Sequence, residues 1–304
     1  MKIITLNTHS LVEKGYEKKL RQFADMVLAE QPDVFALQEV NQSVQAGCLA
    51  EEKLPGFVAC PGIGRGLRED NHAARLAQIL FAAAAPYYWT WVPAKLGYGK
   101  YDEGLAVFSR RPIVETDSFL ISGCSDYYNW KTRRILGVKA DGFKGGWFYT
   151  VHMGWWDDLE EPFSRQWERL EEHVKAAKEE GPLWLMGDFN SPDSVAGQGY
   201  DLVKKGGWLD TYEMAKEKGS GATVEEEIDG WRDLPLEGGG KGGQQGCEAP
   251  HGGGKKATAM RIDYIWCSRP VPVARSLVVC DGRAYPKVSD HYGVMIVAEE
   301  DKSL

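Results

Sequence analysis

An aspartate and an asparagine two residues apart, Asp188 and Asn190, follow a short apolar run in the segment PLWLMGDFNSP. The run at 183–186 lies between Gly-Pro and Gly, a composition typical of a buried strand. Ligands of α/β proteins bind at the carboxyl ends of strands. A carboxylate and an amide at such an edge could hold a metal ion, a water molecule or a phosphate oxygen. Aspartate and asparagine also serve as caps and turn residues, so this segment alone leaves both interpretations open.

Other predicted strands present an amide, a carboxylate or an imidazole in a comparable position, which indicates one site assembled by the fold. These strands and their polar residues are 1–7 with Asn7, 34–39 with Glu39, 147–152 with His152, 261–266 with Asp263, and 294–298, which Asp290 and His291 precede. Apolar residues at helical spacing predict helices with a core-facing side around 20–28, 73–81 and 163–177. We expect these helices to pack on the strands that position the site.

The segments LNTH, LQEV, EGLAVFSR, TVHMG, GDFN, RIDYIW and SDHYGV together resemble the endonuclease/exonuclease/phosphatase superfamily. They follow one another in the expected order over nearly the whole chain, and GDFN with a later SDH is the most specific pair. The resemblance implies an α/β fold in which two mixed β-sheets pack as a sandwich with helices on the outer faces. It also implies one domain over 1–304, with a flexible Gly-rich insertion at about 236–257.

The same resemblance implies hydrolysis of phosphate esters with a bound divalent metal. Glu39, Asn7 and Asp290 are the expected metal ligands, since carboxylate and amide oxygens suit Mg²⁺, with Mn²⁺ as an alternative. The implied catalytic groups are Asp188 as the base that deprotonates water, Asn190 as a holder of that water or of a phosphate oxygen, His291 oriented by Asp263, and His152 paired with Glu103.

Two further residues are candidates for binding the substrate phosphate. Arg133 stands at the start of a predicted strand that should run beside the strand of His152, and an arginine fork could clamp a phosphate with two hydrogen bonds. A basic residue at a strand start is also commonly solvated. Tyr101, in the segment KLGYGKYDEG, could donate to a phosphate, although many loop tyrosines only pack.

Composition limits the possible partners and the compartment. The 304 residues carry a net charge of −8 and contain no run of five or more Lys or Arg, which makes a nucleic-acid partner less expected. No signal peptide and no apolar run of the roughly 20 residues that a membrane span needs are recognised, so no membrane partner is expected. The six cysteines form no CxxC pair and are expected to be free thiols, which favours a cytoplasmic protein.

Three functions are considered, and they differ in the ligand that the site would bind. The first is a phosphomonoesterase for a phosphorylated sugar, favoured by aromatic clusters such as 87–91, 127–130 and 155–156, because aromatic faces pack on sugar rings. The phrases NWKTRRILG and HMGWWDD resemble the bacterial maltose 6′-phosphate phosphatase group, which implies a disaccharide phosphate as substrate; the Gly-rich segment departs from that group. The second is a metal-dependent nuclease acting on DNA or RNA. The third is a non-catalytic binding module, which seven intact motifs disfavour.

Overall fold

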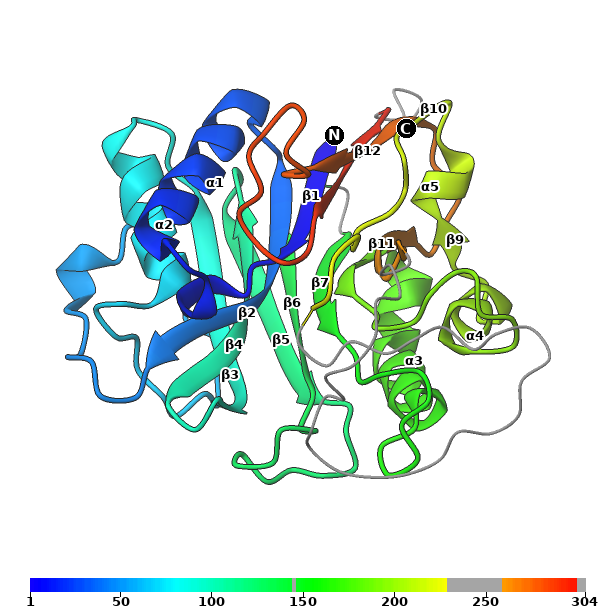
Figure 1. Cartoon of the computed structure of the whole chain (residues 1–304), viewed down its shortest axis with the longest axis horizontal. Helices are drawn as coiled ribbons and strands as arrows, with labels where there is room; N and C mark the ends of the chain where they lie inside the picture. The colour runs from blue at the N-terminus through cyan, green and yellow to red at the C-terminus, as the bar shows by residue number, and fades with distance from the viewer. Residues whose placement is uncertain (144–145, 229–258, 300–304) are drawn as a thin grey trace.

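Two mixed β-sheets lie face to face at the centre of the computed structural model (Figure 1), which describes residues 1–143, 146–228 and 259–299. The predicted Gly-rich insertion at 236–257 lies outside the described residues. The seven-stranded sheet has the order β10 (Glu217–Lys218), β12 (Val273–Val279), β13 (Gly293–Ala298), β1 (Lys2–Asn7), β2 (Val34–Ser43), β4 (Tyr101–Ser109) and β3 (Tyr88–Gly97). The six-stranded sheet has the order β5 (Ile113–Leu120), β6 (Arg134–Ala140), β7 (Trp147–His152), β8 (Leu183–Asp188), β11 (Asp263–Cys267) and β9 (Leu209–Asp210).

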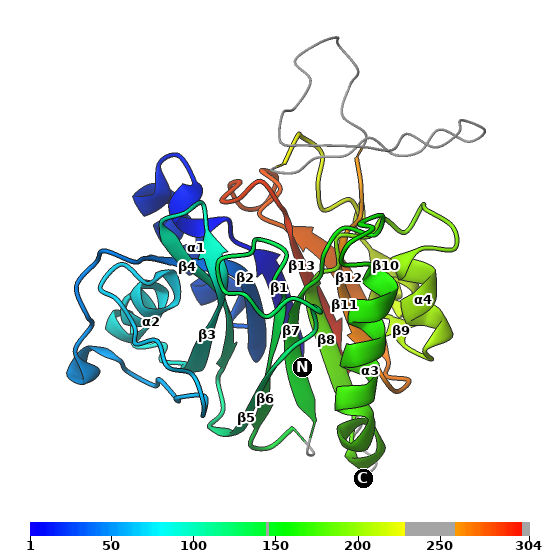
Figure 2. The same ribbon diagram turned by 90° about the horizontal axis from the view of Figure 1, so that it is seen from below.

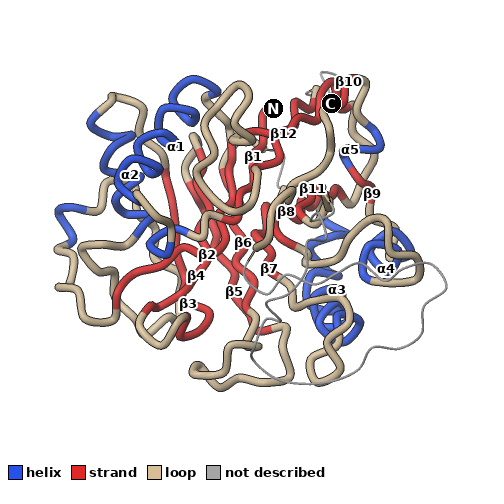
Figure 3. Tube along the Cα trace, in the orientation of Figure 1, coloured by secondary structure: helices blue, strands red, loops and turns tan. Residues whose placement is uncertain are grey.

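Helices cover the outer face of each sheet (Figures 1 and 2). α1 (Tyr16–Glu30) and α2 (His72–Ala82) lie on the seven-stranded sheet, and α3 (Phe163–Glu180) and α4 (Gly199–Lys205) lie on the six-stranded sheet. Figure 3 shows the resulting order of helix, sheet, sheet and helix across the molecule. The predicted α/β sandwich is therefore confirmed. The remaining elements are short: the 3₁₀ turns η1 (Ser10–Val12) and η2 (Glu51–Lys53), and α5 (Thr211–Met214).

The alternation of side chains along each strand explains this layering. In β8, Trp184 and Met186 join the apolar core between the two sheets, whereas Leu183 and Leu185 join the core under α3 and α4. Successive side chains of a strand point to opposite faces, so a continuous apolar run can bury both faces of a central strand. Strands of this kind hold their carboxyl ends rigidly, which is what a site at those ends requires.

Two predicted strands have other boundaries in the structure. The strand predicted at 261–266 is β11, which begins only at Asp263. Glu103 also lies inside a strand, because β4 begins at Tyr101. β2 continues to Ser43 past a β-bulge, because its register with β4 shifts between Leu37 and Val40. In each case pairing with a neighbouring strand, which the local sequence does not encode, sets the boundary.

Two expectations from composition can be compared with the described residues. The five cysteines in this part of the chain are free thiols, as expected. Among its helices, none combines the length and the apolar character needed to cross a membrane.

Candidate active site

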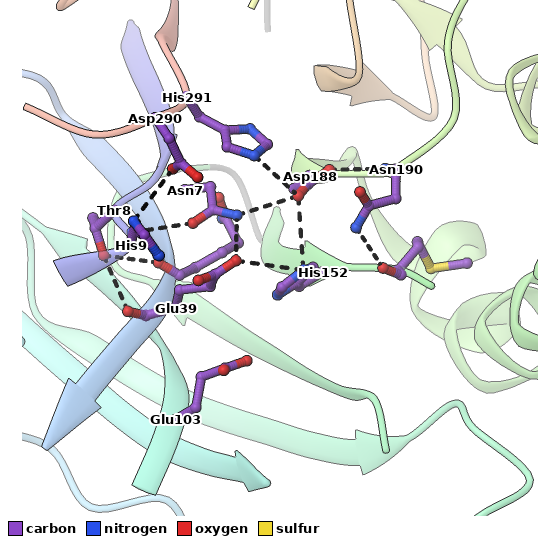
Figure 4. Close-up of polar contacts among 12 residues, drawn as sticks. Asn7, Thr8, His9, Glu39, Glu103, His152, Asp188, Asn190, Asp290 and His291 are labelled. Atoms are coloured by element: carbon purple, nitrogen blue, oxygen red, sulfur yellow. Dashed lines mark hydrogen bonds and ion pairs between the residues drawn. The ribbon is translucent and has the colours of Figure 1, made fainter. Parts of the chain in front are cut away.

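The carboxyl ends of two pairs of parallel strands meet at one rim of the sandwich (Figure 4). β1 runs parallel to β2 in one sheet, and β7 runs parallel to β8 in the other. Asn7, at the end of β1, joins the two sheets: its amide nitrogen donates to Glu39 Oε1 at 2.9 Å and to Asp188 Oδ2 at 3.2 Å. Residues 181 positions apart in the sequence therefore share one polar cluster.

The backbone around this cluster adopts conformations that side chains normally avoid. Glu39 in the β2 bulge has φ 52°, and Asn190 has φ 47°. Gly187, just before Asp188, has φ 146°, and a Cβ there would lie 2.0 Å from the Val151 carbonyl oxygen. Bulges turn a side chain away from the regular alternation, and strained residues gather at functional sites. The chain thus directs Glu39, Asp188 and Asn190 toward the rim at a cost in backbone strain.

Asp188 is buried and holds a defined set of hydrogen bonds. Its Oδ1 accepts the Asn190 backbone N–H at 2.8 Å, and its Oδ2 accepts the Asn7 amide. Burial and the nearby charge of Asp263 raise the pKa of Asp188 to about 7. A carboxylate with a pKa near neutrality is suited to take a proton from water at neutral pH. The Asn190 side chain is fixed by a hydrogen bond from its amide to the Met153 carbonyl oxygen at 2.9 Å.

His291 contacts both aspartates of the six-stranded sheet. Its Nδ1 lies 2.9 Å from Asp263 Oδ2, the contact that the family resemblance implies, and its Nε2 lies 3.9 Å from Asp188 Oδ2. Asp263 and Asp188 are paired directly across β11 and β8. Burial lowers the pKa of His291, but the charges of Asp263 and Asp188 outweigh it and hold this pKa well above the usual value. The His291 side chain is thus held as an imidazolium, a proton donor.

His152 has a different environment from the one expected. Its Nε2 lies 3.7 Å from Asp188 Oδ2 and 4.0 Å from Glu39 Oε1, and burial together with Arg133 holds its pKa well below the usual value. The predicted pairing with Glu103 is wrong. Glu103 instead forms an ion pair with Lys95, 3.1 Å from Nζ to Oε1, because β3 and β4 place these two residues directly opposite each other.

The two candidate phosphate-binding residues occupy different places. Arg133 is buried and lines a small cavity together with Glu103 and His152, so it lies beside the polar cluster. Tyr101 is also buried, but its hydroxyl donates to the Leu11 carbonyl oxygen at 3.4 Å. That hydrogen bond ties Tyr101 to the η1 turn, and so the geometry favours Arg133.

Sequence reasoning missed His9, which the structure places at the same rim. His9 Nδ1 lies 2.8 Å from Glu13 Oε1 and 3.8 Å from Asp290 Oδ1, and Nε2 lies 3.1 Å from the Tyr98 hydroxyl. Burial lowers its pKa, yet Glu13 and Asp290 raise it to about 9. His9 stands in the LNTH motif, but two residues beyond the strand end, where periodicity gives no direction for its side chain.

The carboxylates at the rim suit a divalent cation. Burial and the charges of Glu103 and Asp290 raise the pKa of Glu39 to about 7, so negative charge is crowded here, and a cation would relieve the repulsion. Asp188, Asp263 and His291 also have ligand atoms within 4.8 Å of one another. The Asn7 amide oxygen accepts the His9 N–H at 3.2 Å while its nitrogen faces Glu39, and an amide oxygen has a second lone pair, so Asn7 as a metal ligand stays a prediction. Glu39 and Asp290 offer carboxylate oxygens of the kind that Mg²⁺ binds, and Asn7 orients Glu39.

Comparison with known proteins agrees with this fold and shows the family of the chain. The model of the endonuclease/exonuclease/phosphatase family matches residues 4–291, so the chain belongs to this family. Members of the family are phosphoester hydrolases, typically dependent on a divalent metal. No curated protein matches the sequence significantly.

Solved structures with the same fold include proteins with different stated activities. A family member from Leptotrichia buccalis is 28% identical with a TM-score of 0.79, covering 99% of this chain and 100% of its own. A mannosyl-6-phosphatase from Bacteroides thetaiotaomicron is 20% identical with a TM-score of 0.59 and the same coverage. TDP2 from D. rerio, complexed with a single-strand DNA product, is 15% identical with a TM-score of 0.58, covering 99% of both chains. The last two show the shared fold alone.

Proposed function

We propose that the protein is a Mg²⁺-dependent phosphomonoesterase that acts in the cytoplasm on a phosphorylated sugar, such as a disaccharide phosphate like maltose 6′-phosphate. The observation that carries the hydrolytic part is the bridging position of Asn7 between Glu39 and Asp188. It brings a candidate metal ligand and a candidate base to one rim, with two histidines beside them.

The proposed roles follow from protonation and position. Asp188 orients and deprotonates the attacking water, which Asn190 helps to hold. His291, held by Asp263, donates to the phosphoryl oxygens as their charge grows, and His152 lies on the other side of Asp188. Glu39 and Asp290, with Asn7 as a further candidate, would hold Mg²⁺, or Mn²⁺ in its place, and the bound ion would supply positive charge for the phosphoryl oxygens and the leaving group. Arg133 binds the substrate phosphate.

Exposed aromatic rings support a sugar as the substrate. Trp130 is 54% exposed, and Tyr98, whose hydroxyl lies 3.1 Å from His9 Nε2 at the rim, is 46% exposed. The Trp130 carbonyl oxygen accepts hydrogen bonds from Lys95 Nζ at 3.1 Å and from Arg133 at 2.8 Å, which fixes the Trp130 backbone beside the candidate phosphate site. A sugar ring attached to a phosphate bound there could stack on this indole. The mannosyl-6-phosphatase neighbour and the net charge of −8 agree with this choice.

A phosphate-release screen with Mg²⁺ tests this proposal. We expect hydrolysis of at least one mono- or disaccharide phosphate at a kcat/KM well above that for nucleotides, and little nicking of plasmid DNA. The alternative of a nuclease draws on the TDP2 neighbour with its DNA product. Plasmid cleavage that rivals the best sugar phosphate, with a steep decrease in activity as salt rises, would replace our proposal by that alternative.

Trp130→Ala provides a second prediction, on substrate contact. Removing the indole should raise KM for the preferred sugar phosphate by about five- to tenfold, as expected for one lost stacking contact of about 1 to 1.4 kcal/mol, and leave kcat nearly unchanged. Activity on 4-nitrophenyl phosphate serves as the reference for the intact phosphate site. Phe81→Ala is the matched control, because Phe81 is 58% exposed but lies on α2, on the outer face of the other sheet. An equal change in both variants contradicts a role for Trp130.

A further inference from the structure

A buried basic corner, formed by Lys95 and Arg133, adjoins the candidate active site. Lys95 is on β3 and Arg133 immediately precedes β6, and the two residues are 7% and 6% exposed. Both line one cavity with His152 and Glu103. Lysine and arginine are almost never this deeply buried unless an opposite charge compensates them. The negative charge that balances Lys95 and Arg133 therefore indicates which ligand the site binds.

Glu103 alone cannot balance this corner. It is the one carboxylate among the residues that line the cavity, and it pairs with Lys95 at 3.1 Å. Burial and the charge of Arg133 lower the pKa of Lys95, and burial also lowers that of Arg133. The charge of Glu39 reaches both cations, and those of Asp188 and Asp158 reach Arg133, but Glu39 is a candidate metal ligand and Asp188 the candidate base. Among the residues that line the cavity, the cations therefore outnumber the carboxylates.

The corner also has hydrogen-bond donors without an acceptor. Lys95 Nζ donates to the Trp130 carbonyl oxygen at 3.1 Å besides its contact with Glu103, which leaves one of the three ammonium hydrogens. Arg133 uses one terminal nitrogen for the carbonyl oxygens of Trp130 and Thr132, at 2.8 and 3.3 Å. Its Nε is buried and has no hydrogen-bond partner among the described residues. A buried N–H without a partner is costly, and an anionic oxygen would satisfy it.

We propose that Lys95, held in place by Glu103, acts with Arg133 to select a doubly charged terminal phosphate, so that the enzyme prefers phosphate monoesters to diesters. The inference rests on the proposed phosphoester hydrolysis and adds the residues that define the substrate class. A phosphate monoester carries about −1.5 to −2 charges at pH 7 and three terminal oxygens. A diester carries a single charge, and its second ester group would have to enter the closed corner in place of the third oxygen. Glu103 is a positioning residue, since it acts through Lys95.

A purely structural ion pair between Lys95 and Glu103 would behave differently. It would affect the free energy of unfolding without changing the ratio of monoester to diester hydrolysis. Removing Lys95 alone would leave the Glu103 carboxylate buried and unpaired, which strongly destabilises proteins. The double variant Lys95→Met with Glu103→Gln removes both charges and keeps similar volumes, so it is the variant that preserves the fold.

The test compares this double variant with the wild-type holoenzyme in Mg²⁺, on 4-nitrophenyl phosphate and bis(4-nitrophenyl) phosphate. We expect kcat/KM for the monoester to fall roughly ten- to a hundredfold, as for a lost charge-assisted hydrogen bond, and that for the diester to change by less than about threefold. The Kd of orthophosphate, measured by calorimetry on the same proteins, should rise by a similar factor as the monoester kcat/KM falls. Lys100→Met is the control, because Lys100 is an exposed lysine on the turn between β3 and β4.

Two results overturn the proposal: equal losses for monoester and diester, or an unchanged Kd of orthophosphate in the double variant. The outcome is independent of the sugar screen. Failure to find a sugar substrate would reject the proposed function while the monoester preference stands. Conversely, an enzyme that hydrolyses sugar phosphates but keeps its substrate ratio in the double variant would reject only the role of the basic corner.

Discussion

Asp188→Asn should abolish turnover while leaving the fold intact. Asparagine has the same size and can still accept the Asn190 N–H, but it cannot take a proton from water. Loss of a positioned base typically costs 10²–10⁴-fold, and we expect kcat to fall by about that factor or more. Stability should change little, because relief of the repulsion between two buried aspartates paired across β8 and β11 offsets the loss of the acceptor for the Asn7 amide. Phosphate release and thermal unfolding of the same preparation measure both effects.

The matched control for this substitution is Asp281→Asn. Asp281 lies in the turn just after β12, where its side chain accepts the Arg283 N–H at 3.0 Å, so the activity of this variant should equal that of the wild type. Turnover within about tenfold of wild type in Asp188→Asn would assign proton abstraction to another group. His152 would then be the next residue to substitute, because its Nε2 lies 3.7 Å from the Asp188 carboxylate and burial keeps its imidazole neutral.

The second large effect is expected from Glu39→Gln. Glutamine retains an acceptor for the Asn7 amide but removes the charge that would hold the metal. Chelation of divalent ions should abolish phosphate release by the wild type, and added Mg²⁺ should restore it. In the variant, the Mg²⁺ concentration for half-maximal rate should rise by about one to two orders of magnitude. Substitution of a residue that holds or orients a metal ligand typically weakens metal affinity by that factor.

Thermal unfolding gives a reading of metal binding that does not depend on activity. A ligand that binds only the folded state stabilises it in proportion to the logarithm of its concentration, so Mg²⁺ should raise the wild-type Tm. The same Mg²⁺ should raise the Tm of Glu39→Gln much less. Glu17→Gln is the control, since Glu17 is an exposed carboxylate of α1 paired with Arg75. An equal Mg²⁺ response in all three proteins places the metal elsewhere.

The sequence by itself determined most of the strands and the polar residues at their ends, and its resemblance to a known family implied the sandwich of two mixed sheets. Three apolar runs form strands that end at Asn7, His152 and Asp188. In each of them the polar residue is adjacent to the apolar run, so the local sequence pattern predicts both the strand and the residue at its end. The contact of His291 with Asp263 followed from the family resemblance of two short motifs. Whether these residues perform the proposed chemistry stays a prediction, which the substitutions above test.

Only the tertiary structure decided the partners of these side chains. Glu103 faces Lys95 and not His152 because the register of β3 on β4 sets its neighbour, and register depends on residues far from either one. The bulge that turns Glu39 to the rim and the orientation of the Asn7 amide likewise arise from pairing between strands and across sheets. The local sequence specifies which polar side chains lie at the edge of a sheet. Long-range packing specifies which of these side chains are in contact and how their charges balance.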